Sequence, residues 1–350
     1  MSERVRLCFE QQAQWCTQLG SPFTALLCGM LAQHLDRSSA VSRRVLDWPA
    51  ERNPMIDALA LRLTGGLHAL VRQGRLPGLA ALYPPHPLPD GDELWAATAA
   101  ALEMASEALM PWLDGAPQTN EIGRSALFMS GALVATAELG LPLALYELGA
   151  SAGLNLLFDR YRYRLGDLEI GRTASPVVLA PAWRGAAPPK ADIQVIRRCG
   201  VDLSPIDAGN EQDRERLLAY IWPDQADRLE RTGAALAIAA ASPPRLDRAD
   251  AADWIERMLD PAPEAGTLRV VLHSIAFQYF PTETRRRIKA HLRAVGETAT
   301  TAGPLAWLRF EGDAQHPGKP ALKLTLWPGG AERTLATADG HAREIEWLWA

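Results

Sequence analysis

The 350-residue sequence predicts an α/β protein in which an all-helical N-terminal domain precedes an open sheet. Residues 1 to about 140 contain only seven Val or Ile residues, so we expect few strands there. From Leu143 onward, short apolar runs alternate with helical patterns, which is typical of an open sheet with helices between its strands. We place the domains at residues 1–115 and 116–350.

The first domain contains four stretches with helical periodicity. They cover residues 4–19, 22–35, 56–72 and 94–113. Ser21 stands where an N-cap belongs and Pro22 occupies the first helical position, while Asp90 and Asp92 precede the last stretch. The segment 83–92 is rich in proline and is predicted to be a loop.

Seven short runs of the second domain read as strands: 143–148, 176–179, 192–199, 267–275, 304–310, 321–327 and 343–349. Predicted helices cover residues 154–161, 211–220, 225–240, 251–259 and 284–295. The last runs lack long helices between them, so we expect an antiparallel hairpin at the sheet edge. An insertion at about 160–190 should begin with a hairpin that turns at Gly166 and Asp167.

Composition narrows the possible functions. The net charge of −5 and the pI near 5.9 give no basic surface for nucleic acid. The four cysteines form no C-x-x-C pair, so neither a metal site nor a disulfide framework is expected. The N-terminus has no signal-peptide pattern, and the apolar stretch 126–145 is interrupted by Glu138, Gly140 and Pro142. We therefore expect a cytoplasmic protein that does not span a membrane.

The segment YELGASAGLN, residues 146–155, carries the strongest functional signal. An apolar run leads into a glycine-bracketed turn that opens a helical pattern, as at many ligand-binding turns. Residues 149–153 also match G-x-S-x-G, the nucleophile elbow of serine hydrolases, with Ser151 as the nucleophile. That alternative would require earlier strands and an upstream oxyanion loop, and the sequence offers neither. Dinucleotide and P-loop patterns fail at this turn as well.

Glu147, Gly149, Ser151 and Gly153 together resemble motif I of class I S-adenosylmethionine-dependent methyltransferases, an acid followed by Gly-x-Gly-x-Gly. The segment GVD, ending at Asp202, resembles that family's second strand and its ribose-binding acid. The resemblance implies a Rossmann-like, class I methyltransferase-type open sheet that binds S-adenosylmethionine. Two departures are Ser151 at the middle glycine position and the 55 residues (202 minus 147) between the two acids.

Along nearly its full length, the chain also resembles an uncharacterised bacterial family. Four segments carry this resemblance: QTNE at Gln118, ELGASAGLN at Glu147, WPDQ at Trp222 and H-S at His273. The family likeness names no reaction. We interpret WPDQ as structural.

Four further residues complete the candidate site. Asn120 and Arg124 could reach the amino-acid end of the cofactor, although QTNE also reads as a helix start. Asn155 belongs to the same glycine-rich segment and is assigned to cofactor binding. Asp250 could contact the adenine or serve as an N-cap, and both roles remain open.

His273 ends the most convincing strand and is the one candidate base, the alternative being a structural histidine. The sequence therefore predicts a methyltransferase with an unknown, small-molecule acceptor, whose pocket the helical domain could cap. A serine hydrolase and a catalytically inactive ligand-binding protein remain alternatives.

Overall fold

The computed structural model describes residues 2–260 and 262–349 and divides into two compact units. The first unit comprises Met1–Thr119 and Glu211–Glu230, and the second comprises Asn120–Asn210 and Arg231–Ala350. The chain first passes from the helical unit to the second unit after Thr119, four residues beyond the boundary predicted at residue 115. The return of residues 211–230 to the helical unit has no counterpart in the predicted domains.

In its described residues, the first unit contains helices joined by turns and loops, and no strand. Its helices are α1 (Ser2–Gln18), α2 (Pro22–His34), α3 (Ala40–Leu46), α4 (Leu59–Arg72), α5 (Pro77–Ala80), α6 (Gly91–Met104), α7 (Ser106–Asp114) and α9 (Glu211–Ala219). The predicted helix 94–113 is divided into α6 and α7 at Ala105. Asp90, which precedes the predicted helix, caps α6 by accepting hydrogen bonds from the N–H groups of Asp92 and Glu93.

The WPDQ segment closes the N-terminus of α2. Pro22 occupies the first turn as predicted, but Ser21 makes no cap bond to its own helix. Asp224 accepts from the Phe23 N–H at 2.8 Å and from the Ser21 hydroxyl at 2.5 Å. A distant carboxylate thus takes the capping role, which agrees with the structural interpretation of WPDQ.

The second unit contains a nine-stranded sheet in the order β5-β12-β11-β10-β9-β8-β1-β6-β7. The five strands β7, β6, β1, β8 and β9 run parallel, and β10, β11 and β12 continue the sheet as an antiparallel meander. Their bounds are β1 (Leu143–Leu148), β5 (Ala182–Arg184), β6 (Val195–Asp202), β7 (Arg245–Arg248), β8 (Leu268–Ser274), β9 (Leu305–Glu311), β10 (Ala321–Trp327), β11 (Glu332–Ala338) and β12 (Glu344–Trp347). The predicted fold class, an α/β protein with an open sheet and a helical N-terminal region, is confirmed.

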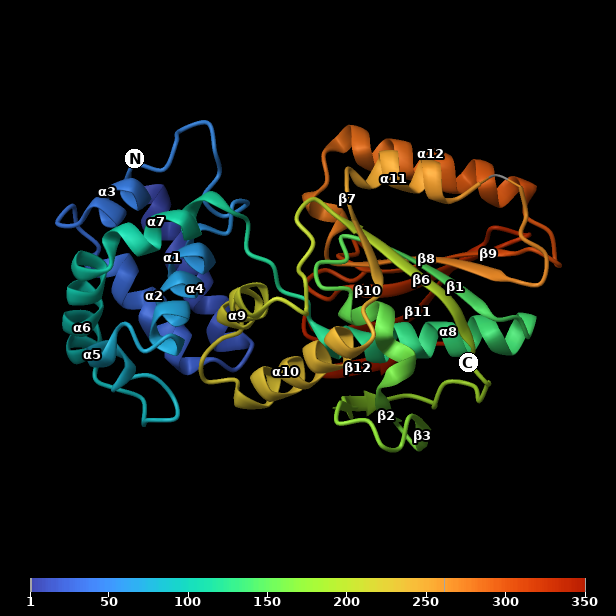
Figure 1. Cartoon of the computed structure of the whole chain (residues 1–350), viewed down its shortest axis with the longest axis horizontal. Helices are drawn as coiled ribbons and strands as arrows, with labels where there is room; N and C mark the ends of the chain where they lie inside the picture. The colour runs from blue at the N-terminus through green and yellow to red at the C-terminus, as the bar shows by residue number, and fades with distance from the viewer. Residues whose placement is uncertain (1, 261, 350) are drawn as a thin grey trace. The chain divides into compact units, whose positions relative to one another are not determined.

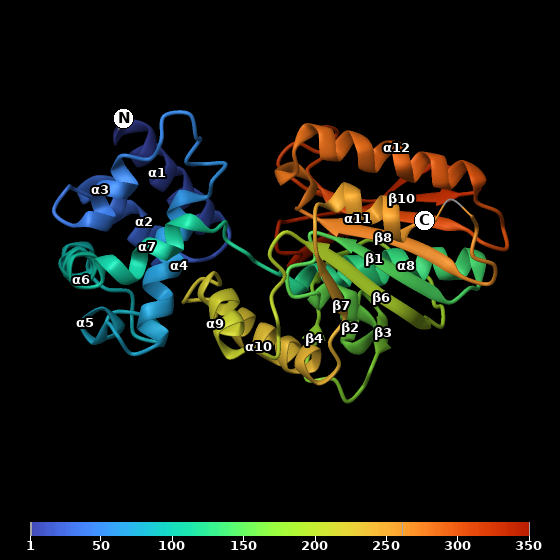
Figure 2. The ribbon, with the colours of Figure 1, turned by 45° about the horizontal axis from the view of Figure 1, so that its top comes forward.

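Helices cover both faces of this sheet. Figures 1 and 2 show α11 (Ala251–Met258) and α12 (Thr282–Thr298) on one face and α8 (Ser125–Leu139) on the other. The remaining helix is α10 (Ala226–Ala241), and the division between the two units falls within it, after Glu230. Three short 3-10 helices, η1 (Ile122–Arg124), η2 (Leu154–Arg160) and η3 (Phe277–Tyr279), lie beside the strand ends.

The predicted insertion contains a small second sheet. Its hairpin consists of β2 (Arg162–Leu165) and β3 (Leu168–Gly171), and the turn lies at Gly166 and Asp167. The strand β4 (Val178–Leu179) pairs with β2 on the other side. Among the described residues, no helix is both long enough and apolar enough to cross a lipid bilayer.

Alternation along the strands decides which layer each side chain enters. In β1, Ala144, Tyr146 and Leu148 belong to the core that contains α11 and α12. Because neighbouring strand residues point to opposite faces, Glu147 points to the α8 face. In β8, Val271 lies in the α11/α12 core, so His273 points to that side.

Candidate functional site

The candidate site lies at the carboxyl ends of the parallel strands. From β1 the chain adds β6 and then β7 on one side, whereas β8 and β9 are added on the other. The reversal makes the end of β1 the topological switch point, where ligands bind in open α/β sheets. Glu147, Asp202 and Ser274 end or nearly end the three central strands.

The turn after β1 has left-handed backbone at three alternate residues. The φ angles are +71° at Gly149, +51° at Ser151 and +68° at Gly153. The N–H groups of residues 149 and 150 both donate to the Val201 carbonyl at 2.9 Å, and the N–H of residue 151 donates to Asp202 Oδ2 at 3.0 Å. Because these amides already have partners, the turn differs from a phosphate-binding loop, whose N–H groups face the ligand.

The glycines of this region allow the chain to pack closely on itself. A Cβ on Gly149 would lie 2.8 Å from Ala276 Cβ, and one on Gly153 would lie 2.7 Å from Pro244. Gly200, in the GVD segment, would place a Cβ 2.6 Å from Ala150. The part of the protein that approaches Gly149 closely is therefore the loop after β8.

Glu147 is buried, and its Oε2 has no hydrogen-bond partner among the described residues. Burial, followed by the negative charge of Asp202, raises the pKa of Glu147 well above its usual value. A hydrogen bond from the Asn155 side chain and the charge of Arg124 oppose this rise without cancelling it. A buried carboxyl with one unsatisfied oxygen is destabilising, so its presence at a strand end needs a reason.

The other polar residues predicted near Glu147 form hydrogen bonds within the protein. Asn155 Oδ1 accepts a 2.7 Å hydrogen bond from the Ser125 hydroxyl at the start of α8. Asn120 Oδ1 accepts from the Leu154 N–H at 2.9 Å. Arg124 donates to the carbonyls of Gly340 at 3.0 Å and Ser274 at 3.2 Å. The QTNE and ELGASAGLN segments therefore meet, and these three side chains use their polar atoms on the protein itself.

Ser151 combines an uncommon backbone with an unpartnered hydroxyl. Its φ of +51° is left-handed, and within the described part of the chain its Oγ contacts no hydrogen-bonding atom. A positive φ suits a nucleophile elbow, but a serine nucleophile also needs a base within hydrogen-bond reach. No described histidine fills that role, so the hydrolase constellation is incomplete.

Both predicted aspartates have a hydrogen-bond partner on each carboxylate oxygen. Asp202 ends β6 on the same sheet face as Glu147 and is partly exposed, while its Oδ1 accepts from the Ser204 N–H at 2.9 Å. Asp250 is the N-cap of α11, accepting from the N–H groups of Ala252 and Asp253 through Oδ1, and its Oδ2 accepts from Thr284 at 3.1 Å. The N-cap geometry of Asp250 favours the capping role, whereas the two amides bound by Asp202 belong to Ser151, in the turn after β1, and to Ser204.

His273 is fully buried, and both ring nitrogens are hydrogen-bonded. Trp307 Nε1 is only a donor, so His273 Nε2 accepts its 3.1 Å hydrogen bond. The proton of the neutral ring is then on Nδ1, which donates to Glu311 at 2.7 Å. This arrangement leaves no nitrogen to accept a proton from a substrate, so it favours a structural histidine over the predicted base.

Glu311, at the end of β9, was not singled out from the sequence. Its Oε1 also accepts from the N–H groups of Ala276 and Phe277, each at 3.1 Å. Burial raises its pKa, but the hydrogen bond from His273 and these amides lower it further, so the pKa lies below its usual value. Glu311 therefore fixes the loop that covers Gly149. Local sequence pattern could not predict this role, because the pairing of β9 with β8 brings Glu311 to these partners.

Comparisons with known proteins identify a family but no activity. No curated protein matches the chain. One solved structure, described as "DhpI-SAH complex structure", is 11% identical, covers 63% of this chain and 82% of its own, and superposes with a TM-score of 0.21. A TM-score this low does not establish a shared fold. Within the described residues, no group of three or more His, Cys, Asp or Glu side chains is placed to hold a metal ion. A family model described as "Uncharacterized protein conserved in bacteria (DUF2332)" matches residues 6–347, so the chain belongs to this family.

Proposed function

We propose that the second unit binds S-adenosylmethionine at the carboxyl end of β1 and transfers its methyl group to a small-molecule acceptor. The observation that carries the proposal is Glu147, a buried carboxyl with one unpartnered oxygen at the switch point. Strongly perturbed carboxyls in such positions are candidates for ligand binding. A donor group of a bound ligand would supply the missing hydrogen bond.

The residues around Glu147 fit an adenosyl ligand better than a nucleotide. Asp202 shares the sheet face of Glu147 and is partly exposed, and a carboxylate can accept hydrogen bonds from two vicinal hydroxyls. The amides of residues 149–151 are engaged within the protein, so the turn offers little to a phosphate group. S-adenosylmethionine carries hydroxyl and ammonium donors and no phosphate.

Methyl transfer requires little covalent chemistry from the protein. When bound, the cofactor supplies an activated methyl group on a sulfonium. The protein's contribution would be to hold ligand and acceptor in line and to exclude water. Glu147 and Asp202 are the proposed binding residues. Asn120 and Asn155 form hydrogen bonds that hold the turn after β1, and Arg124 binds the carbonyls of Ser274 and Gly340. We assign no general base.

Calorimetric titration of the full chain with S-adenosylmethionine and with S-adenosylhomocysteine tests the proposal. We expect saturable heat with both ligands and its loss in Glu147→Gln. Glu169→Gln, on the exposed hairpin of the insertion, is a matched control that should bind normally. Absence of heat at high micromolar ligand in a folded sample would refute the proposal.

The two alternative functions, a serine hydrolase and a ligand sensor, predict different experimental results. A serine hydrolase is favoured only by the positive φ of Ser151, and it predicts fluorophosphonate labelling that Ser151→Ala abolishes. A ligand sensor predicts binding without methylation of any acceptor in a cell extract.

A further inference from the structure

The loop after β8, residues 275–280, has an uncommon backbone and packs against the turn after β1. Ile275 has a φ of +44°, a left-handed conformation that is a genuine outlier for a β-branched residue. A Cβ on Gly149 would lie 2.8 Å from Ala276 Cβ and 3.7 Å from Phe280 Cζ. Two residues of this β8 loop therefore contact the first glycine of the turn that carries the candidate site.

A single carboxylate oxygen on the neighbouring strand holds the β8 loop. Glu311 Oε1 accepts from the N–H groups of Ala276 and Phe277 at 3.1 Å and from His273 Nδ1 at 2.7 Å. Ala276 stands at the N-cap position of η3 and has no polar side chain, so Glu311 takes the capping role from β9. Burial opposes the ionisation of Glu311, but the His273 hydrogen bond and the two amides keep its pKa below the usual value. Hydrogen bonds to an ionised acceptor are the stronger kind.

Packing and further hydrogen bonds fix the same loop from the side of β8. The His273 ring stacks on Phe277, with centroids 4.7 Å apart and an angle of 17° between the ring planes. Its Nε2 accepts from Trp307 at 3.1 Å, and the Ile275 N–H donates to the Phe310 carbonyl at 2.9 Å. A strained backbone persists only where its surroundings determine the conformation, and these contacts do so for Ile275.

We infer that Glu311 is a positioning residue for the ligand site at the end of β1. It holds the β8 loop in the conformation that sets Ala276 and Phe280 against Gly149, and so orders the surroundings of the turn before a ligand arrives. A loop ordered in advance reduces the entropy lost on binding. Glu311 acts through the backbone amides of the loop rather than by touching the ligand. The inference rests on the cofactor site proposed above.

Calorimetric titration of the full chain with S-adenosylmethionine tests this role in variants of Glu311. Glu311→Ala removes the acceptor, so we expect about tenfold weaker binding and faster amide hydrogen exchange at residues 276 and 277. Glu311→Gln retains an oxygen that can accept from the same N–H groups, so it should restore most of the affinity. Glu311→Asp, which is one methylene shorter, replaces Glu311→Ala if that variant does not fold.

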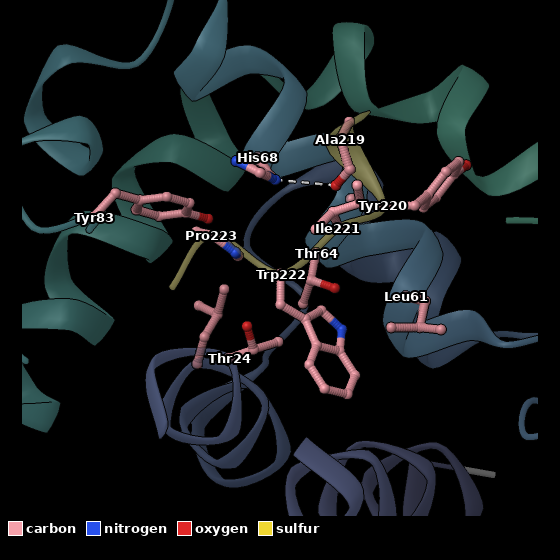
Figure 3. Close-up of a pocket in the computed structure, with 12 residues that line it drawn as sticks. Thr24, Leu61, Thr64, His68, Tyr83, Ala219, Tyr220, Ile221, Trp222 and Pro223 are labelled. Carbon is pink, nitrogen blue, oxygen red and sulfur yellow. Dashed lines mark hydrogen bonds between the residues drawn. The ribbon is translucent and has the colours of Figure 1, made fainter. Parts of the chain in front are cut away.

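His68 in the helical unit provides a control for lost stability alone. Its ring is buried, and its Nδ1 lies 3.1 Å from the Ala219 carbonyl (Figure 3). His68→Ala should lower the melting temperature without changing the affinity, because His68 belongs to the other unit. Wild-type affinity in folded Glu311→Ala or Glu311→Asp would overturn this inference alone. If the wild-type chain itself does not bind, the proposed function fails and this inference fails with it.

Discussion

The ends of β1 and β8 lie side by side in the sheet, yet their buried titratable residues have opposite surroundings. Glu147 points to the α8 face and has an oxygen without a partner among the described residues. His273 points to the α11/α12 face, where Trp307 and Glu311 satisfy both of its nitrogens. Position at a strand end therefore does not identify a functional residue. The hydrogen bonds that the fold leaves unmade are more informative.

The largest effect is expected from His273→Ala. It leaves the Glu311 carboxylate and the Trp307 N–H without their partner, at a cost of about 3–5 kcal/mol in the free energy of unfolding. Chemical denaturation measures the loss. If His273→Ala instead keeps its stability and loses only methyl transfer, His273 is a base after all.

A pH titration of stability should reveal a third buried group, His68 in the helical unit. Its pKa is lowered from 6.5 to about 4, so the unfolded chain binds the proton first as the pH falls. Stability should therefore decrease from pH 6.5 to pH 4, by up to about 3 kcal/mol from this residue. His68→Gln should flatten that part of the profile. An unchanged profile would mean that His68 is not buried in its neutral form.

Glu147→Gln should stabilise the protein. A raised pKa in the folded state means that the unfolded chain loses its proton first as the pH rises, so wild-type stability falls above the unfolded pKa. The substitution removes this penalty, by about 1–3 kcal/mol at neutral pH, and the two proteins should converge in acid. Thermal unfolding at pH 4 and pH 7 checks both points. Destabilisation by Glu147→Gln at pH 7 would show that the carboxylate is satisfied in the native state.

The smallest effect is expected at Ser151. A left-handed backbone costs about 1 kcal/mol for a residue with a Cβ, so Ser151→Gly should stabilise the turn by that amount. Cofactor binding should be retained if the hydroxyl does not contact the ligand. A large loss of binding would instead assign Ser151 Oγ to the site.

The sequence predicted features that depend on local pattern. The change from helical to strand patterns near Leu143, the hairpin turn at Gly166 and the helix that follows Asp90 are all present. Pattern also placed Glu147 and His273 at strand ends. The partners of His273 could not be predicted, because Trp307 and Glu311 are brought to it only by the pairing of β8 with β9. The return of residues 211–230 to the helical unit likewise depends on tertiary contacts such as Asp224 with Phe23.

Calorimetric titration with S-adenosylmethionine, comparing the wild-type chain with Glu147→Gln, is the most direct test of the central claim. We predict saturable binding by the wild type and none by the variant, which should be at least as stable as the wild type. No binding by the folded wild type, or equal affinity in Glu147→Gln, would contradict the assignment of Glu147 to a cofactor site.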